Sequence, residues 1–388
     1  MKTLLAFSGG LDTSFCVAWL REQGHEVHTV TVDTGGFSAA KLARIEKLAC
    51  DLGAVTHTTI DAREELFHNY LRFLLAGNVL RGGTYPLCVG AERVCQARAV
   101  VERALEIGAN ALAHGSTGAG NDQVRFDVAF RTLAPELKII TPIRDLALSR
   151  TQEREFLTER GCPFPEKLEQ YSVNEGMWGT TIGGRETHDS WQTLPDTAYS
   201  GGEVSATLPE RDLTISFHGG APDNPVAAIE ELNAIGHKYG IGRGVHLGDT
   251  ILGIKGRVGF DAPAAHLLIA AHRELEKLVL SAKQLFWKEH LGNLYGTLLH
   301  EGHFFDPLAR DLEALLESSQ RDVTGEVRVR IFPRTFVVLG VRSPRGLMRA
   351  DTSYGEGTTL WSAGEAAGFA KIFGIPHMIA AQRHSAVT

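Results

Sequence analysis

The stretch AFSGGLDTS, residues 6–14, places two glycines, three hydroxyl side chains and one carboxylate directly after an apolar run. Glycines let a backbone come close to phosphate oxygens, and serine and threonine hydroxyls add further donors. The stretch has no lysine, although the commonest nucleotide-binding loop places a lysine on the β and γ phosphates. Its composition predicts a phosphate-binding loop whose missing lysine needs an explanation.

A second polar stretch, AHGSTGAGNDQVRFD, covers residues 113–127. It carries hydroxyl, amide, carboxylate and guanidinium groups on Ser116, Thr117, Asn121, Asp122, Gln123 and Arg125. A polar surface loop is the alternative interpretation, but donors, acceptors and one arginine after a strand favour a site for the carboxylate and amine of an amino acid. Tyr85, Ser172 and residues 240–263 are further candidates, each weak by itself.

Cysteine and histidine form no metal-binding pattern. The five cysteines are widely spaced and include no Cys-x-x-Cys pair, so we expect free thiols and no metal site built from protein ligands alone. The HEGHF stretch that begins at His300 is the densest histidine cluster, and no ligand set at helical spacing follows it.

Strand patterns and helix patterns alternate along the first 160 residues, and these elements must position the two polar stretches. The alternation predicts a doubly wound, mostly parallel α/β sheet. The expected strands cover residues 3–7, 26–33, 55–61, 111–115 and 137–143. The expected helices cover residues 12–23, 37–54, 63–79 and 92–109. Asp12 is expected to be the N-cap of the first helix. Because ligands bind at the carboxyl ends of such strands, both polar stretches should reach the same sheet edge.

Glycine and threonine become frequent near Glu166, which predicts a second domain. We therefore expect domains at residues 1–165 and 166–388. The second is expected to contain a hairpin and helix over 212–229, a strand over 249–260, helices within 264–318, a half-solvated hairpin over 325–341 and a tail helix near 361–374.

The composition excludes several partners. With a net charge of −7 and a pI of about 6.2, the chain has no basic stripe for nucleic acid or a membrane surface. The apolar start is shorter than a signal peptide, and no apolar run reaches the roughly 18 residues of a membrane span. We expect a cytoplasmic location.

The SGGLDTS stretch resembles the pyrophosphate loop of the N-type ATP pyrophosphatases, which implies cleavage of ATP between the α and β phosphates. A loop that binds departing pyrophosphate can use N–H groups, hydroxyls and a metal ion, so it needs no lysine. The stretches AFSGGLDTS, HGSTGAGNDQVRF, YSVNE and GRGVHLGDTILGIKGRVGFDAP, in this order, resemble the argininosuccinate synthases over most of the chain.

This resemblance implies an adenine nucleotide alpha hydrolase-like domain, a second α+β synthetase domain and a C-terminal helical oligomerisation arm that ties a homotetramer. It implies a ligase that joins citrulline and aspartate with ATP and Mg²⁺, through a citrullyl-AMP intermediate, and releases AMP and pyrophosphate. The small-molecule substrates would be its only ligands, with no nucleic acid and no membrane.

The resemblance also assigns site residues. It implies that ATP is held by Ala6, Ser8, Gly9, Gly10, Asp12, Thr13, Ser14, Val32 and Gly115. It implies that aspartate is held by Thr117, Asn121 and Asp122, and citrulline by Tyr85, Asn121, Arg125, Ser172 and Thr181. Asp12 and Arg125 are the expected catalytic residues, and no dedicated general base stands out.

Several positions depart from the family pattern. Ala119 stands in place of lysine, Gly90 and Thr181 in place of serine, Gly248 and Asp249 in place of Glu-Asn, and Phe260 in place of tyrosine. Most fall on the citrulline side, where we expect Asp249 to hold the citrulline amine. This leaves free citrulline or an N-acylated citrulline as the acceptor, with a tRNA-modifying ATP pyrophosphatase and an inactive binding paralogue as further alternatives.

Overall fold

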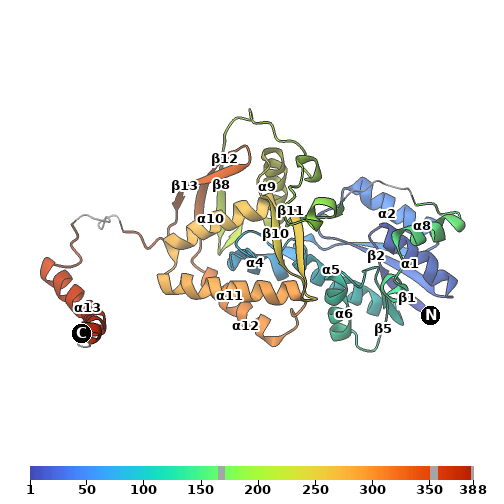
Figure 1. Ribbon diagram of the computed structural model, residues 1–388, viewed down its shortest axis with the longest axis horizontal. Helices are drawn as coiled ribbons and strands as arrows, with labels where there is room; N and C mark the ends of the chain where they lie inside the picture. The colour runs from blue at the N-terminus through green and yellow to red at the C-terminus, as the bar shows by residue number, and fades with distance from the viewer. Residues whose placement is uncertain (165–170, 350–356, 386–388) are drawn as a thin grey trace. The chain divides into compact units, whose positions relative to one another are not determined.

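The computed structural model describes residues 1–164, 171–349 and 357–385. The chain divides into two compact units, Met1–Pro344 and Arg345–Thr388. All predicted site residues belong to the first unit, whose elements are labelled in Figure 1.

A five-stranded parallel sheet forms the N-terminal part of the first unit. Its strands are β1 (Lys2–Ala6), β2 (Glu26–Asp33), β3 (Thr56–Asp61), β4 (Ala111–Ala113) and β5 (Lys138–Ile140), in the order β3-β2-β1-β4-β5. The chain runs outward from β1 to β3 and returns on the other side of β1, so the topological switch point lies between β1 and β4. The predicted doubly wound fold is confirmed, and its ligand site is expected at this switch point.

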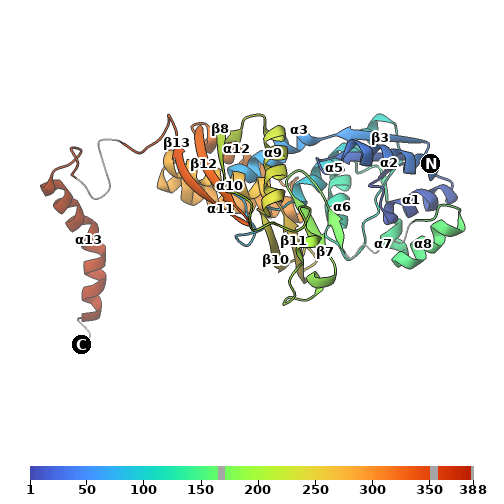
Figure 2. The same cartoon turned by 90° about the horizontal axis from the view of Figure 1, so that it is seen from above.

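Helices cover both faces of the sheet because alternate side chains of a strand point to opposite faces. Leu5 belongs to the core formed with α1 (Leu11–Glu22), α2 (Ala39–Asp51), α7 (Pro142–Leu146) and α8 (Arg150–Glu159). Leu4 belongs to the core formed with α5 (Gly90–Glu106) and α6 (Asp122–Leu133). Figure 2 shows α5 and α6 on the side of the strands opposite to α1 and α8.

The start of α1 differs from the prediction. Gly10 is the N-cap, and Asp12 lies inside the first turn, so the expectation that Asp12 caps this helix was wrong. Gly10 makes no side-chain cap, which leaves the first N–H groups of α1 to another acceptor. The Asp12 carboxylate remains at the positive end of the helix, where negative charge is favoured.

Two antiparallel sheets, ordered β10-β11-β7-β6 and β13-β12-β8-β9, follow. Their strands are β6 (Ser172–Asn174), β7 (Thr180–Gly183), β8 (Arg211–His218), β9 (Ala221–Pro222), β10 (Arg243–Asp249), β11 (Lys255–Asp261), β12 (Gly325–Phe332) and β13 (Thr335–Arg342). The single strand predicted over 249–260 was wrong, because Asp249 pairs with Lys255 across a turn in which Gly253 has φ +81°. A glycine that adopts positive φ allows the chain to reverse there.

The remaining helices of the first unit supply most of its other buried apolar side chains. They are α9 (Pro225–Tyr239), α10 (Pro263–Val279), α11 (Ala282–Glu301) and α12 (Pro307–Gln320), with α3 (Arg63–Leu66), η1 (Phe67–Leu71), α4 (Arg72–Ala76), η2 (Arg185–His188) and η3 (Asp196–Ala198) as shorter elements. The hairpin predicted over 325–341 is confirmed, with Val327, Val329 and Ile331 buried on one face.

The second unit contains α13 (Ala363–Ser385), which confirms the predicted tail helix. Its exposed apolar side chains are Phe369, Ile372, Phe373, Ile375, Met378 and Ile379. Within the described part of the chain, no helix has both the length and the apolar character needed to cross a membrane.

Candidate active site

The loop between β1 and α1 is bent by Gly9. This residue has φ +71°, and a Cβ on it would lie 2.9 Å from Ile45 Cγ1, so a larger residue would strain the backbone and press on α2. The hydroxyl oxygens of Ser8 and Thr13 lie 3.3 Å apart, and the Thr13 hydroxyl donates to the Gly10 carbonyl oxygen. Hydroxyls and the first N–H groups of α1 therefore meet at a helix end that favours anions.

Gly115 and Val32 flank this loop from the neighbouring strands. Gly115 follows β4, and a Cβ on it would lie 3.1 Å from Thr13 Cγ2. Val32 is buried near the carboxyl end of β2. The residues expected to hold ATP thus lie around the switch point of the sheet.

Two buried oxygens near this loop have no hydrogen-bond partner among the described residues. They are Ser14 Oγ, in α1, and Glu153 Oε2, in the first turn of α8. Buried polar atoms without partners are rare in native proteins, so these two oxygens stand out beside the predicted phosphate-binding loop. Sequence analysis did not select Glu153, because it lies far from the loop along the chain.

On the acceptor side, Asp122 is held between two arginines at the start of α6. Its carboxylate accepts from Arg125 Nη1 at 2.6 Å and from Arg93 Nε at 2.9 Å. Burial opposes ionisation, but the two guanidinium groups outweigh it and lower the pKa of Asp122 to about 2. Arg125 is itself buried and donates Nε to the His300 carbonyl oxygen at 2.8 Å. The predicted residues Asp122 and Arg125 are therefore brought together as an ion pair, in which the arginine is buried and the carboxylate is partly exposed.

Arg93 connects this pair to the sheet that carries Thr181. Its Nη2 donates to Asn174 Oδ1 at 2.8 Å, and Asn174 Nδ2 donates to Thr181 Oγ1 at 3.4 Å. Sequence analysis missed Arg93 and Asn174. Asn174 stands two residues after Ser172, and residues two apart in a strand lie on the same face, so this spacing could have indicated Asn174 as a site residue. No sequence signal distinguished Arg93 from the exposed arginines of other helices.

Tyr85 is buried among three rings. His246 stacks on it with the ring centroids 5.4 Å apart, and the rings of Phe260 and His300 lie at 5.4 and 6.4 Å. Burial and the nearby Arg125 lower the pKa of His300 to about 2, so this imidazole is neutral. His246 was missed and His300 was noted only as part of a histidine cluster, because β10 and α11 meet Tyr85 only in the folded chain.

The two histidines occupy space beside two departures from the family pattern. A Cβ on Gly90 would lie 3.2 Å from His300 Cα, and a Cβ on Gly248 would lie 2.5 Å from His246 Nε2. A side chain at Gly248 would displace the His246 ring, whereas one at Gly90 would require the backbone at His300 to give by a few tenths of an ångström. Asp249, expected to hold the citrulline amine, is 60% exposed and pairs with Lys255 at 2.7 Å.

A cavity of about 860 Å³ adjoins the second polar stretch. Ala119, Gly120 and Ser172 line it together with the basic Arg150 and Lys255. Its size is within the range of small-molecule sites, about 300–1,000 Å³. Basic side chains at its wall suit a ligand that carries carboxylates.

Asn121 and Thr117 lie on the loop that forms one side of this cavity. Asn121 Oδ1 accepts from the Ile251 backbone N–H at 2.9 Å, which ties the β10–β11 turn to the loop. Thr117 is exposed, and its carbonyl oxygen accepts from the Gly120 N–H at 3.4 Å. The hairpin that was predicted as one strand therefore covers the region expected to bind aspartate.

Glu92 is a further carboxyl group that sequence analysis missed. It lies in the first turn of α5, is 1% exposed, and its Oε1 has no hydrogen-bond partner in the described residues. Burial raises its pKa to about 8. A Cβ on Gly176 would collide with this carboxyl, so only glycine fits opposite it.

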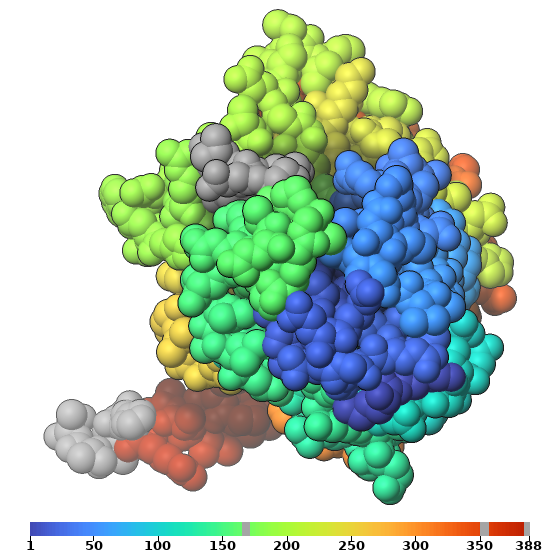
Figure 3. All heavy atoms as spheres, turned by 90° about the vertical axis from the view of Figure 1, so that its right-hand side faces the viewer, coloured from blue at the N-terminus to red at the C-terminus, as the bar shows by residue number. Residues whose placement is uncertain are grey.

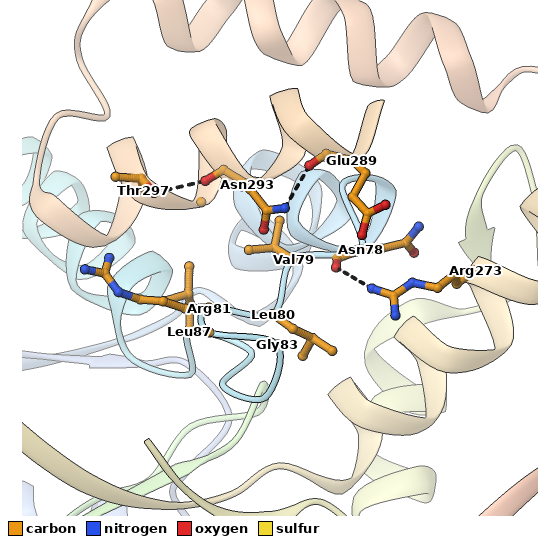
Figure 4. A pocket seen from close by; sticks show the side chains of 12 residues that line it. Asn78, Val79, Leu80, Arg81, Gly83, Leu87, Arg273, Glu289, Asn293 and Thr297 are labelled. Atoms are coloured by element: carbon orange, nitrogen blue, oxygen red, sulfur yellow. Dashed lines mark hydrogen bonds between the residues drawn. The ribbon is translucent and has the colours of Figure 1, made fainter. Parts of the chain in front are cut away.

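A separate cavity of about 500 Å³ lies between α11 and residues 78–87 (Figure 4). Asn78, Arg81, Arg273 and Glu289 line it, and Arg273 Nη2 donates to the Asn78 carbonyl oxygen at 3.3 Å. It contains none of the predicted site residues.

The fold and the site define a class of nucleotide-binding α/β enzyme with a lysine-free phosphate loop at the sheet's switch point. The family model "Arginosuccinate synthase N-terminal HUP domain" matches residues 2–163, and "Arginosuccinate synthase C-terminal domain" matches residues 171–380. Together they span most of the chain, which belongs to the argininosuccinate synthase family.

Curated relatives agree with this assignment. An argininosuccinate synthase from Xylella fastidiosa is 38% identical over 385 residues, 96% of this chain and 95% of that protein. An argininosuccinate synthase from Methanocaldococcus jannaschii is 40% identical over 353 residues, 89% of each chain. Neither the acylated acceptor nor the tRNA-modifying alternative is favoured by these matches.

Proposed function

We propose that this protein uses ATP to join citrulline to aspartate, producing argininosuccinate, AMP and pyrophosphate. Membership of the argininosuccinate synthase family over nearly the whole chain supports this activity. The lysine-free loop at the end of β1 is the observation that supports this reaction most directly. It presents hydrogen-bond donors at a helix N-terminus and contains no lysine that could contact a γ phosphate.

The reaction needs two substitutions because the ureido oxygen of citrulline is a poor leaving group. That oxygen attacks the α phosphorus of ATP, forms the bond to AMP and expels pyrophosphate. The aspartate amine then attacks the ureido carbon and expels AMP. The protein's main task is to hold three ligands in line and to stabilise the charge of the departing groups.

We assign the residues as follows. The nucleotide is held by Ala6, Ser8, Gly9, Gly10, Thr13, Ser14, Val32 and Gly115, with Asp12 near the phosphates. Aspartate is held by Thr117, Asn121 and Asp122, and citrulline by Tyr85, Asn121, Arg125, Ser172, Thr181 and Asp249. The basic lining of the 860 Å³ cavity beside Ser172 supports binding of the substrate carboxylates there.

Mg²⁺ is part of this proposal. Hard oxygen donors suit Mg²⁺, and Asp12, in the first turn of α1, is the residue that would hold it. When bound, the ion supplies positive charge to the departing pyrophosphate. Across the described ranges, no group of three or more His, Cys, Asp or Glu side chains could hold a metal, so phosphate oxygens would have to complete the site.

We further propose a domain boundary near residue 165, a cytoplasmic location and a homotetramer tied by α13. The apolar side chains exposed on α13, including Phe369 and Phe373, support the tetramer, because such a surface favours burial against another chain. Replacing both phenylalanines by aspartate is expected to convert the tetramer to a smaller species in light scattering. An unchanged mass would contradict the role of α13.

The activity is tested with purified protein, ATP and Mg²⁺, with and without each amino acid. We expect equal amounts of AMP and pyrophosphate only when citrulline and aspartate are both present. We also expect labelled pyrophosphate to exchange into ATP with citrulline alone, because adenylation comes first. Release of ADP would contradict the mechanism, and exchange driven only by N-acylated citrulline would replace the acceptor.

A further inference from the structure

The cavity of about 500 Å³ between α10, α11 and residues 78–87 lies outside the site described above. Figure 3 faces the end of the first unit that carries the β1–α1 loop, where the blue N-terminal segment lies beside the green segment that contains α8. Figure 1 shows α10 and α11 away from that end. None of the residues assigned to ATP, aspartate or citrulline lines this cavity, so a ligand in it would occupy a separate site.

Two opposite charges line the cavity without a partner of opposite sign. The Arg273 guanidinium, on α10, is half-buried and donates Nη2 to the Asn78 carbonyl oxygen, and it forms no ion pair with any described carboxylate. The Glu289 carboxylate, on α11, is exposed and forms no hydrogen bond or ion pair in the part of the chain that the structure describes. Figure 4 shows both side chains at the Asn78 end of the cavity.

Arg81, the other guanidinium of the cavity, is already paired. Its Nη2 donates to Glu301 Oε1 at 3.3 Å and to the Asp249 carbonyl oxygen at 3.5 Å. On the α11 wall, Asn293 Nδ2 donates to the Glu289 carbonyl oxygen at 2.9 Å, so the Asn293 side-chain oxygen remains an acceptor for a ligand. Arg273 and Glu289 are therefore the two charged groups that a ligand could pair with.

The floor of the cavity holds Arg273 in a fixed place. Asn78 is 8% exposed, its Nδ2 donates to Glu276 Oε2 at 2.6 Å, and its Oδ1 lies 2.7 Å from His272 Nδ1. Lys288 Nζ lies 2.8 Å from the same Glu276 oxygen and neutralises that buried carboxylate. Because this network fixes Asn78, the carbonyl oxygen that orients Arg273 is preorganised, and a ligand need not order it on binding.

We propose that this cavity binds a free α-amino acid as a zwitterion, with its carboxylate on Arg273 and its ammonium group on Glu289. Guanidinium groups bind carboxylates through directed, charge-assisted hydrogen bonds, and an ammonium group donates to a carboxylate in the same way. A simple anion would leave Glu289 unpaired, and a simple cation would leave Arg273 unpaired. Only a ligand that carries both charges satisfies both walls, and the assignment does not depend on the proposed function.

Isothermal titration calorimetry of the full chain without ATP tests the site. The probes are the standard L-amino acids other than aspartate, added singly, so that no proposed substrate is present. We expect at least one to bind with a Kd below about 1 mM. Its N-acetyl form, which lacks the ammonium group, and its amide, which lacks the carboxylate, should each bind at least about 10-fold more weakly. Absence of binding by all probes, or equal binding of either derivative, would overturn the proposal.

Substitutions locate the bound amino acid. Arg273→Gln and Glu289→Gln should each weaken its binding at least about 10-fold, and Arg273→Lys, which keeps the charge, should give an intermediate affinity. Glu274→Gln is the matched control, because Glu274 pairs with Lys277 on α10 and does not line the cavity, so the affinity should not change. Thermal unfolding verifies that each variant is folded. Wild-type affinity in either glutamine variant would overturn the proposal.

Discussion

The nucleotide side and the acceptor side of the site are organised differently. The nucleotide side depends on one short loop, and polar atoms such as Ser14 Oγ there have no hydrogen-bond partner in the part of the chain that the structure describes. The acceptor side is assembled from distant elements and is already paired, as the Asp122–Arg125 ion pair shows. Nine consecutive residues can form a binding site for phosphate. A binding site for a small zwitterion needs residues from many parts of the chain.

The largest effect is expected on the nucleotide side, from Gly9→Ala. The added Cβ would lie 2.9 Å from Ile45 Cγ1 at a residue with φ +71°, so the loop must shift away from the phosphates. We expect kcat/KM for ATP to fall at least about 100-fold, comparable to the loss of a charge-stabilising donor. Gly24→Ala is the control, because it has φ +77° and no atom within 4 Å of the new Cβ. Equal losses in both variants would contradict this explanation.

The next effect is on stability, from Asp122→Asn on the acceptor side. The change leaves the guanidinium groups of Arg93 and Arg125 without their carboxylate, which is expected to lower the free energy of unfolding by about 1–3 kcal/mol at pH 7. Denaturant titration measures this difference. Asp212→Asn, which breaks an exposed pair with Arg330, should cost less than about 1 kcal/mol.

The same carboxylate gives a pH dependence. Its folded pKa of about 2 lies below its usual range, so the ionised form stabilises the fold above about pH 4, and this contribution is lost as the pH falls through 2. The stability difference between wild type and Asp122→Asn should therefore shrink between about pH 4 and pH 2. A constant difference over this interval would argue against the ion pair as its source.

A smaller effect, confined to the acceptor side, is expected from Gly248→Glu. Its Cβ would lie 2.5 Å from His246 Nε2 and would push that ring from Tyr85. We expect KM for citrulline to rise about 10-fold, equivalent to about 1.4 kcal/mol, with KM for ATP unchanged. The double variant with His246→Ala should recover most of the loss in steady-state kinetics. If it does not, steric conflict with His246 is the wrong explanation.

The smallest effect is expected from Asp249→Asn. Because the pair with Lys255 is exposed, the free energy of unfolding should change by less than about 1 kcal/mol. If Asp249 also holds the citrulline amine, KM for citrulline should rise several-fold, and steady-state assays measure it. An unchanged KM for citrulline would show that Asp249 does not bind the citrulline amine.

Elements with a strong local period were predicted well. The strand over residues 26–33 coincides with β2, because a parallel strand buried on both faces is a continuous run of β-branched residues. The failures came where a turn competed with a strand pattern, as between Asp249 and Lys255, or where glycine replaced an expected side-chain cap, as at Gly10. In both cases backbone geometry outweighed side-chain preference.

The sequence alone determined the glycine loop that we propose to bind phosphate, the parallel sheet that presents it and the resemblance to a ligase family. These features are local, because a glycine turn and a helix start need only neighbouring residues. Tertiary structure decided the link from Asp122 through Arg93 to Asn174 and the histidines around Tyr85. Such contacts join residues that are distant along the chain, and only the packing of whole elements specifies which of them meet.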